Sequence, residues 1–202
     1  MLKRKIDKYL EEWKASVDKK PLIVKGARQV GKTASIRYFG EKYYNNIVEI
    51  NFALQPKYKQ IFADGYEVDS IIKNITLLNP TLVFVPHETL LFFDELQEYP
   101  DCATSLKSFK QDGRYDVICS GSLMGLYYQQ IESNSVGYKT DYEMYSLDFE
   151  EFLWAKGYDE HFIDDLYQHM LELKPLSNMQ MDVLGGLFSD YMILGGMPEV
   201  VN

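Results

Sequence analysis

The residues Gly26-Ala27-Arg28-Gln29-Val30-Gly31-Lys32-Thr33 decide the fold of this chain. They match the pattern G-x-x-x-x-G-K-[ST] without a gap, and they follow the short apolar run 22–24. The two glycines permit backbone angles that turn successive N–H groups toward phosphate oxygens. Lys32 would reach the β- and γ-phosphates, and Thr33 would offer its hydroxyl to Mg²⁺. The pattern predicts a phosphate-binding loop with residues 26–33 as nucleotide contacts, although Arg28 and Gln29 could equally face a partner or solvent.

A second motif is the run Leu90-Leu91-Phe92-Phe93-Asp94-Glu95, an apolar strand that ends in two carboxylates. A buried strand has no structural reason to end in unpaired charge, because burying such charge is costly. With a phosphate loop upstream, the run predicts a Walker B strand in which Asp94 holds Mg²⁺ together with Thr33. Glu95 would orient or deprotonate the attacking water, which makes Glu95 and Lys32 the candidate catalytic residues. The alternative is that the two acids only open a solvent loop.

A third polar segment, Ser120-Gly121-Ser122, follows the apolar residues 117–119. Either Ser120 or Ser122 could place a hydroxyl near the γ-phosphate, as sensor residues do. An ordinary turn from a strand into a helix, with a serine as the N-cap, fits the same residues equally well.

Apolar periodicity predicts strands that alternate with helices along the chain. The expected strands cover residues 22–24, 47–52, 90–94, 117–119 and 138–147. The expected helices cover residues 2–16 (with Ile6, Tyr9, Leu10, Trp13 and Val17 on the apolar face), 31–43, two pieces within 56–79, 101–112, 148–155, 159–173 and 177–193. Such alternation predicts an α/β fold, a three-layer sandwich with a mostly parallel central sheet and ligands at the carboxyl ends of its strands. We expect a core over 1–155 with an N-terminal amphipathic helix, and a small helical extension over 156–202.

The bulk composition fits one folded domain that is not built into a membrane. The chain has 202 residues, is 46% hydrophobic and carries a net charge of −9. Residues 1–60 contain 14 lysines and arginines against 6 acids, whereas residues 61–202 contain 7 against 24. The acidic second part argues against a nucleic-acid-binding surface there. Two cysteines are too few for a disulfide framework and no signal peptide is evident, so we expect a cytoplasmic protein.

Several segments together resemble prokaryotic AAA-type ATPases whose phosphate-loop domain precedes a C-terminal DUF4143 domain. The matching segments are residues 21–33, the strand 90–95, the turn 120–122, residues 145–153 (YSLDFEEFL) and residues 195–199 (GGMPE). This resemblance implies an ASCE-type P-loop core, in which the catalytic strand lies between the loop strand and its neighbour. It also implies ATP with Mg²⁺ as ligands, contacts from residues 26–33, catalytic roles for Asp94 and Glu95, and a sensor near Ser120.

Members of that family are about twice as long as this chain, which therefore looks like the N-terminal part of a larger protein. A protein or DNA partner would be engaged through the missing C-terminal domain, and an oligomer is left open. Slow turnover is expected, because an arginine finger would have to be Arg4, Arg28, Arg37 or Arg114 or lie outside the chain. The expected function is ATP hydrolysis coupled to movement of a partner; the alternatives are a nucleotide-gated switch with little turnover and a small-molecule kinase.

Overall fold

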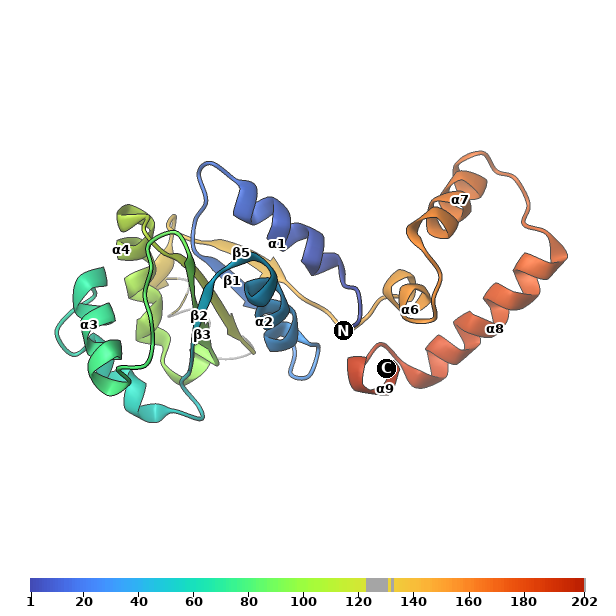
Figure 1. Ribbon diagram of the computed structural model, residues 1–202. Coiled ribbons are helices and arrows are strands. Elements are labelled where there is room, and N and C mark those ends of the chain that lie inside the picture. Colours follow the sequence, from blue (N-terminus) through green and yellow to red (C-terminus); the bar gives the residue numbers. More distant parts are fainter. Residues whose placement is uncertain (123–130, 132, 202) are drawn as a thin grey trace.

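A parallel sheet forms the centre of the core in the computed structural model, which describes residues 1–122, 131 and 133–201. Neighbouring strands pair in parallel in the order β2-β3-β4-β1-β5. The strands are β1 (Leu22–Lys25), β2 (Asn46–Asn51), β3 (Thr89–Asp94), β4 (Asp116–Gly121) and β5 (Thr140–Glu143). Helices cover both faces of this sheet (Figure 1), so the predicted α/β sandwich is confirmed.

The two helical layers follow from the alternation of side chains along each strand. In β3, Leu90 and Phe92 join the apolar cluster on one face, whereas Leu91 and Phe93 join the cluster on the other. The first face is covered by α1 (Lys5–Ala15) and α2 (Lys32–Tyr43). The second face is covered by η1 (Pro56–Phe62), α3 (Val68–Leu78), η3 (Pro100–Thr104) and α4 (Ser105–Asp112), while η2 (Leu96–Glu98) follows β3.

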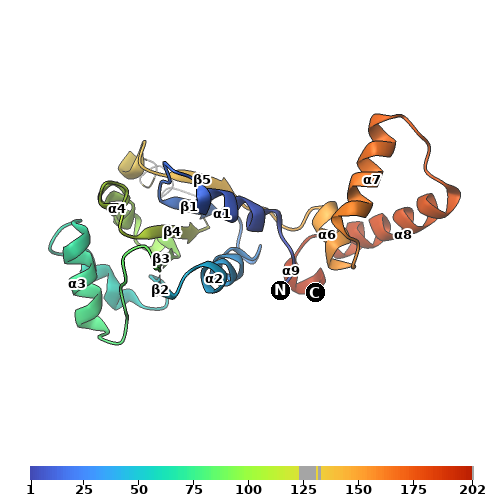
Figure 2. The same ribbon diagram turned by 45° about the horizontal axis from the view of Figure 1, so that its top comes forward.

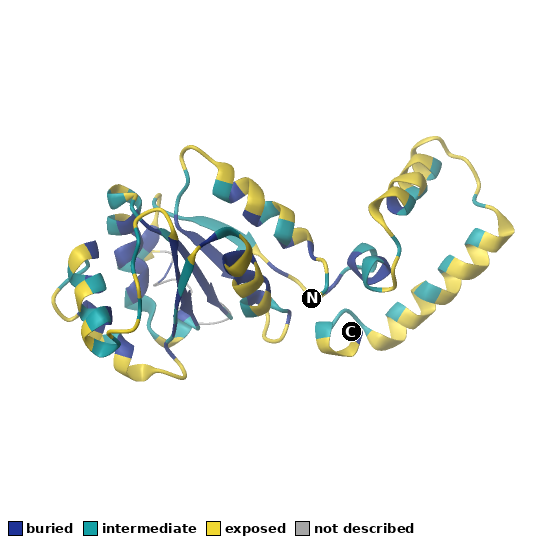
Figure 3. Cartoon of the chain, in the orientation of Figure 1, coloured by how far each residue is buried: buried dark blue, intermediate teal, exposed yellow. Residues whose placement is uncertain are grey.

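A helical region follows the sheet and comprises α6 (Phe149–Ala155), α7 (Glu160–Leu171), α8 (Asn178–Leu194) and α9 (Pro198–Val201). Its small core contains Leu147, Phe152 and Val201. The helices α7 and α8 extend away from the sheet (Figure 2), and most of α8 is exposed (Figure 3). The chain then returns, so that α9 lies beside the N-terminal segment (Figures 1 and 2). The division of the chain at residue 155 stays a prediction.

The helix expected over 148–155 is α6, and the acidic segment 148–151 forms its N-cap and first turn. Asp148 is the N-cap and accepts from the backbone N–H of Glu151, and the Glu151 side chain accepts in return from the N–H of Asp148. This capping box satisfies two N–H groups that would otherwise lack partners at the start of the helix.

Three expectations about the elements were wrong. The last strand covers only 140–143 of the predicted 138–147, because pairing with β1 extends only from Leu22 to Lys25. Val17 is fully exposed rather than on the apolar face, since α1 ends at Ala15. The strand expected to be catalytic, β3, is not next to the loop strand: β3 pairs with β2 and β4, and β4 lies between β3 and β1. Strand β4 suits that central place because its residues 117–121 are all buried.

Candidate phosphate-binding site

The loop 26–31 joins the end of β1 to the start of α2, as predicted. Gln29 and Gly31 have positive φ angles of 65° and 98°, which places both residues in the left-handed region. Gly26 is required for a different reason: a Cβ there would lie 2.0 Å from the carbonyl oxygen of Met144, just after β5. The N-terminus of α2 follows directly, and its partial positive charge favours an anion at the loop.

Lys32 is buried at the base of this loop, with 8% of its surface exposed. Its Nζ donates to the carbonyl oxygens of Gly26 and Ala27, at 2.9 and 2.6 Å. Burial lowers the pKa of the Lys32 ammonium, while Glu95 and Asp94 act in the opposite direction. A buried ammonium held by carbonyl oxygens is not fully compensated, so an anion close to Nζ would stabilise it.

Asp94 is the point at which three strand ends and α2 meet. Its carboxylate is almost fully buried, at 3% exposure. Oδ2 accepts from Thr33 Oγ1 at 3.2 Å and from Asn51 Nδ2 at 3.0 Å. Oδ1 accepts from the Ser120 hydroxyl and from the backbone N–H of Glu95. The structure therefore brings together Thr33, Asp94 and Ser120, which lie far apart in the sequence.

Asn51 is a site residue that sequence reasoning missed. It ends β2, and its side-chain Oδ1 accepts from the N–H groups of Ala53 and Leu54 while Nδ2 donates to Asp94. The only signal in the sequence was a polar residue near the end of a predicted strand. Its importance depends on β2 lying next to β3, and that lateral order is not visible in the sequence.

Glu95 follows Asp94 in a left-handed conformation, with φ of 56° and ψ of 50°. Such backbone strain in a non-glycine residue costs on the order of 1 kcal/mol and often marks a functional site. The Glu95 carboxylate accepts from the Gln97 side-chain amide, and Gln97 Oε1 accepts from the backbone N–H of Ser122 at 3.2 Å. Gln97 was also missed, because nothing in its neighbouring residues distinguishes it from the rest of the loop after Glu95. Ser120 and Ser122 thus differ in position: Ser120 contacts Asp94, and the backbone of Ser122 contacts Gln97.

A cavity of about 260 Å³ adjoins the loop. It begins at Gly31 and the first turn of α2 and continues to the chain's N-terminal residues and to α9. The residues that line it are Met1, Leu2, Arg4, Gly31, Ala34, Ser35, Pro198 and Glu199. Two parts of the chain that are distant in sequence, the loop and the GGMPE segment, therefore share one pocket.

The arginines lie in different environments. Arg37 pairs with Glu49, and Arg114 pairs with Asp112 and Asp69. Arg28 is exposed in the loop, whereas Arg4 is buried, with 5% of its surface exposed. A buried arginine cannot reach into a neighbouring subunit, which removes Arg4 from the candidates for an arginine finger.

Within residues 1–122, 131 and 133–201, no group of three or more His, Cys, Asp or Glu side chains is arranged to hold a metal ion. A divalent ion at Asp94 would therefore need oxygen ligands from a bound phosphate as well. In this described part of the chain, every helix is too short or too polar to cross a bilayer.

Comparison with solved structures finds distant similarities. PCH-2 of C. elegans aligns with a TM-score of 0.47 and 11% identity, over 86% of this chain and 48% of that protein. The Aeropyrum pernix ORC1 protein, solved in complex with DNA, aligns with a TM-score of 0.45 and 11% identity, over 74% of this chain and 45% of that protein. Drosophila ORC, also bound to DNA, aligns with a TM-score of 0.47 and 15% identity, over 72% of this chain and 43% of the matched chain. This chain thus spans less than half the length of each.

The family comparison is more informative. No curated protein matches the chain. The family AAA_14, described as an AAA domain, matches residues 18–153, which include the loop, the acidic strand end and the Ser120 turn. That match extends over most of the chain, and we conclude that the protein belongs to the AAA_14 family of AAA-type P-loop ATPase domains.

Proposed function

We propose that this chain binds ATP with Mg²⁺ at residues 26–33 and hydrolyses it with Glu95 as the residue that activates water. The observation that carries the proposal is the hydrogen bond of 3.2 Å between Thr33 Oγ1 and Asp94 Oδ2. It joins the phosphate-loop motif to the acidic motif, as the chemistry of nucleotide hydrolysis requires. If residues 26–33 formed only a glycine-rich turn, Thr33 would have no functional reason to lie next to Asp94.

The loop supplies the phosphate contacts in this proposal. Backbone N–H groups of residues 26–33 and the N-terminus of α2 would bind the β- and γ-phosphates. The Lys32 ammonium would exchange its carbonyl partners, Gly26 and Ala27, for phosphate oxygens. The cavity beside Gly31 and Ala34 is adjacent to the loop, and the nucleoside part of ATP would lie in or next to it.

The residues around Asp94 fit a magnesium ion. Mg²⁺ prefers oxygen ligands and is usually held by one or two protein oxygens together with phosphate oxygens. The Thr33 hydroxyl and the Asp94 carboxylate are such ligands, and they already lie within hydrogen-bond distance of each other. When bound, Mg²⁺ would neutralise charge that develops on the phosphates. Asn51 and Ser120 orient the Asp94 carboxylate from its other sides.

Glu95 would take a proton from the attacking water or orient it. In the described conformation its carboxylate is held by the Gln97 amide. This contact supports a second candidate function, a nucleotide-gated switch with little turnover, because a glutamate held away from water would not activate it. The two functions differ in whether Glu95 leaves Gln97 when ATP is bound.

Coupling to a partner belongs to the same proposal. Hydrolysis would move the helical region, and through it a protein or DNA partner or a further C-terminal domain, in a cytoplasmic protein. The net negative charge of residues 61–202 favours a protein over DNA as the direct contact of this part.

The test is phosphate release measured together with ATP binding. We expect Glu95→Gln to bind ATP about as tightly as the parent chain and to release phosphate at least ~100-fold more slowly, the range typical of losing a general base. Equal turnover in the two proteins would remove Glu95 from the mechanism. Turnover near background in both, with binding intact, would support the switch.

A further inference from the structure

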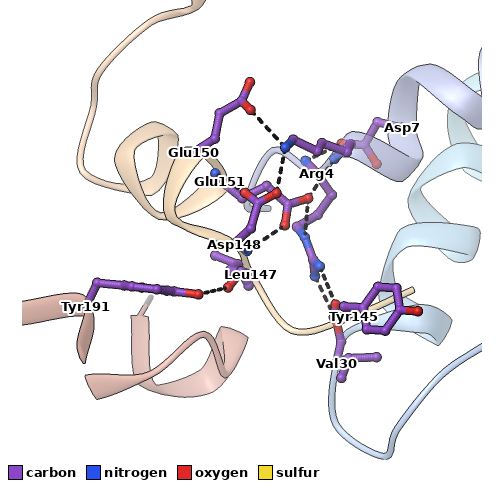
Figure 4. Close-up of polar contacts among 10 residues, drawn as sticks. Arg4, Asp7, Val30, Tyr145, Leu147, Asp148, Glu150, Glu151 and Tyr191 are labelled. Atoms are coloured by element: carbon purple, nitrogen blue, oxygen red, sulfur yellow. Dashed lines mark hydrogen bonds and ion pairs between the residues drawn. The ribbon is translucent and has the colours of Figure 1, made fainter. Parts of the chain in front are cut away.

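Arg4 contacts three separate segments of the chain, and one of them is the phosphate loop (Figure 4). Its Nη1 donates to the carbonyl oxygen of Val30 at 2.7 Å, and its Nη2 donates to the carbonyl of Tyr145 at 2.8 Å. Its Nε donates to Glu151 Oε1 at 3.0 Å, in an ion pair in which both side chains are about 95% buried. A guanidinium is suited to this arrangement, since its donors point in fixed directions from one plane.

The contact with Val30 bears directly on phosphate binding. Val30 stands between Gln29 and Gly31, the two left-handed residues of the loop. The Val30 carbonyl and the Gly31 N–H belong to one trans peptide, so they point in opposite directions. A guanidinium that holds the carbonyl on one side therefore holds the N–H toward the other. Arg4 thus restrains an N–H that the loop would offer to phosphate.

The contact with Glu151 reaches the helical region. Glu151 Oε1 accepts from Arg4 Nε and from the backbone N–H of Lys5, and Glu151 Oε2 closes the capping box of α6. The start of α6 in turn connects to α8, because Tyr191 donates its hydroxyl to the Leu147 carbonyl at 2.9 Å. Figure 4 shows these contacts in series from Val30 to Tyr191.

Pro198, the first residue of α9, lies close to the next loop residue, Gly31. A Cβ on Gly31 would lie 3.3 Å from Arg4 Nη1 and 3.7 Å from the Pro198 side chain. The Gly196 carbonyl accepts from the Leu147 N–H at 2.7 Å, which ties α9 to the start of α6. Nucleotide at the loop would therefore lie against a surface to which the helical region contributes.

We propose that Arg4 is a positioning residue that couples nucleotide binding at the phosphate loop to the docking of the helical region, residues 149–201, and of the segment 145–148 that leads into it. With nucleotide bound, phosphate holds the Gly31 N–H while Arg4 holds the Val30 carbonyl, so the peptide between them is restrained from both sides. This restraint favours the Arg4 conformation that also donates to Glu151 and to the Tyr145 carbonyl. Since coupling free energies are reciprocal, docking of α6 strengthens nucleotide binding by the same factor.

The test combines two measurements on the full chain, and it rests on the proposed function because it uses ATP with Mg²⁺. Titration calorimetry gives the dissociation constant for ATP, and hydrogen exchange followed by mass spectrometry gives the protection of α6. The variant Arg4→Lys keeps the positive charge beside Glu151 and loses the fork that reaches Val30 and Tyr145 together. The matched control is Lys5→Gln, because Lys5 binds Asp148 and Glu150 at the same helix and has no contact with the loop.

We expect ATP to slow exchange in α6 of the parent chain about five-fold or more, within the usual range of coupling between sites. In Arg4→Lys this protection disappears and ATP binds on the order of ten-fold more weakly, as expected for losing charge-assisted hydrogen bonds. Lys5→Gln keeps both properties within about two-fold, as a surface ion pair contributes little. If Arg4→Lys does not fold, Glu151→Gln takes its place: it does not touch the loop, yet we expect weaker ATP binding.

Each contrary outcome has a distinct meaning. ATP binding without any change in α6 exchange overturns the coupling and leaves the proposed function intact. Parent-like behaviour of Arg4→Lys, or of Glu151→Gln where it is used, removes the role of this ion pair. Equal losses of ATP affinity and of α6 protection in Lys5→Gln and Arg4→Lys would show that Arg4 only holds the N-terminal segment in place. Absence of ATP binding in the parent chain overturns the proposed function and the coupling together.

Discussion

The substitution Asn51→Asp tests the geometry around Asp94 most sharply. The Asn51 Oδ1 caps the turn after β2 by accepting from Ala53 and Leu54, and a carboxylate would keep both hydrogen bonds. The Nδ2 donor lies 3.0 Å from Asp94 Oδ2, so the substitution replaces a hydrogen-bond donor by a second negative charge at that distance. At an effective dielectric of ~20, two like charges about 3 Å apart repel by about 5 kcal/mol.

The expected cost is smaller than this repulsion, because Asn51 is partly exposed and the new carboxylate can move. We expect Asn51→Asp to lower the free energy of unfolding by about 3 kcal/mol at pH 7. The repulsion raises the pKa of one carboxyl of the pair in the folded state above its unfolded value of about 4. The cost is therefore complete above that raised pKa and disappears as the pH falls below about 4.

Urea unfolding followed by tryptophan fluorescence, at pH 7 and at pH 4.5, measures this difference. The control is Asn51→Ser, which can still accept in the turn and adds no charge; it should cost about 1–2 kcal/mol at both pH values. The assigned contact between Asn51 and Asp94 would be refuted if Asn51→Asp cost no more than Asn51→Ser at pH 7. A cost that does not fall between pH 7 and pH 4.5 would refute it equally.

Two further predictions concern stability. Gly26→Ala places a methyl group 2.0 Å from the Met144 carbonyl oxygen and should lower the free energy of unfolding, measured by thermal unfolding, by at least ~2 kcal/mol. The control Gly113→Ala has open space around its Cβ and should cost ~1 kcal/mol from its positive φ alone. Equal costs in the two variants would contradict the close approach of the loop to residue 144. Burial raises the pKa of Tyr44, whose hydroxyl donates to Asp116 at 2.6 Å. Because the folded pKa is the higher one, stability falls as the pH rises above about 10, and Tyr44→Phe should reduce that slope by ~1.4 kcal/mol per pH unit; an unchanged slope in alkaline urea unfolding would show that Tyr44 titrates normally in the folded chain.

The features that local patterns encode were the ones that could be predicted. The loop between a strand and a helix at 26–31, the acidic end of the strand at Asp94 and the short helix that begins after Asp148 each occupy a few consecutive residues, and each was predicted from the local pattern. The order of strands was not, because periodicity identifies a strand without identifying its neighbours. The roles of Asn51 and Gln97 depend on that order or on how the chain turns after β3, and both were missed for this reason.

Arg4 illustrates a second limit. In the sequence it lies in a lysine-rich N-terminal helix, where a charged residue is usually part of a solvated face. The structure buries it between the loop and α6, next to a glutamate 147 positions further along the chain. Pairing over such a distance leaves no periodic signal, and the buried ion pair becomes visible only when the helical region is placed against the core.

The central claim is that residues 26–33 bind the phosphates of ATP, and calorimetric titration of the full chain with ATP and Mg²⁺ tests it most directly. We predict saturable binding with one site per chain, weaker binding without Mg²⁺, weaker binding of GTP, and no measurable binding to Lys32→Ala, which should remain folded by circular dichroism. Unchanged ATP affinity in Lys32→Ala, or no ATP binding by the folded parent chain, would contradict the account.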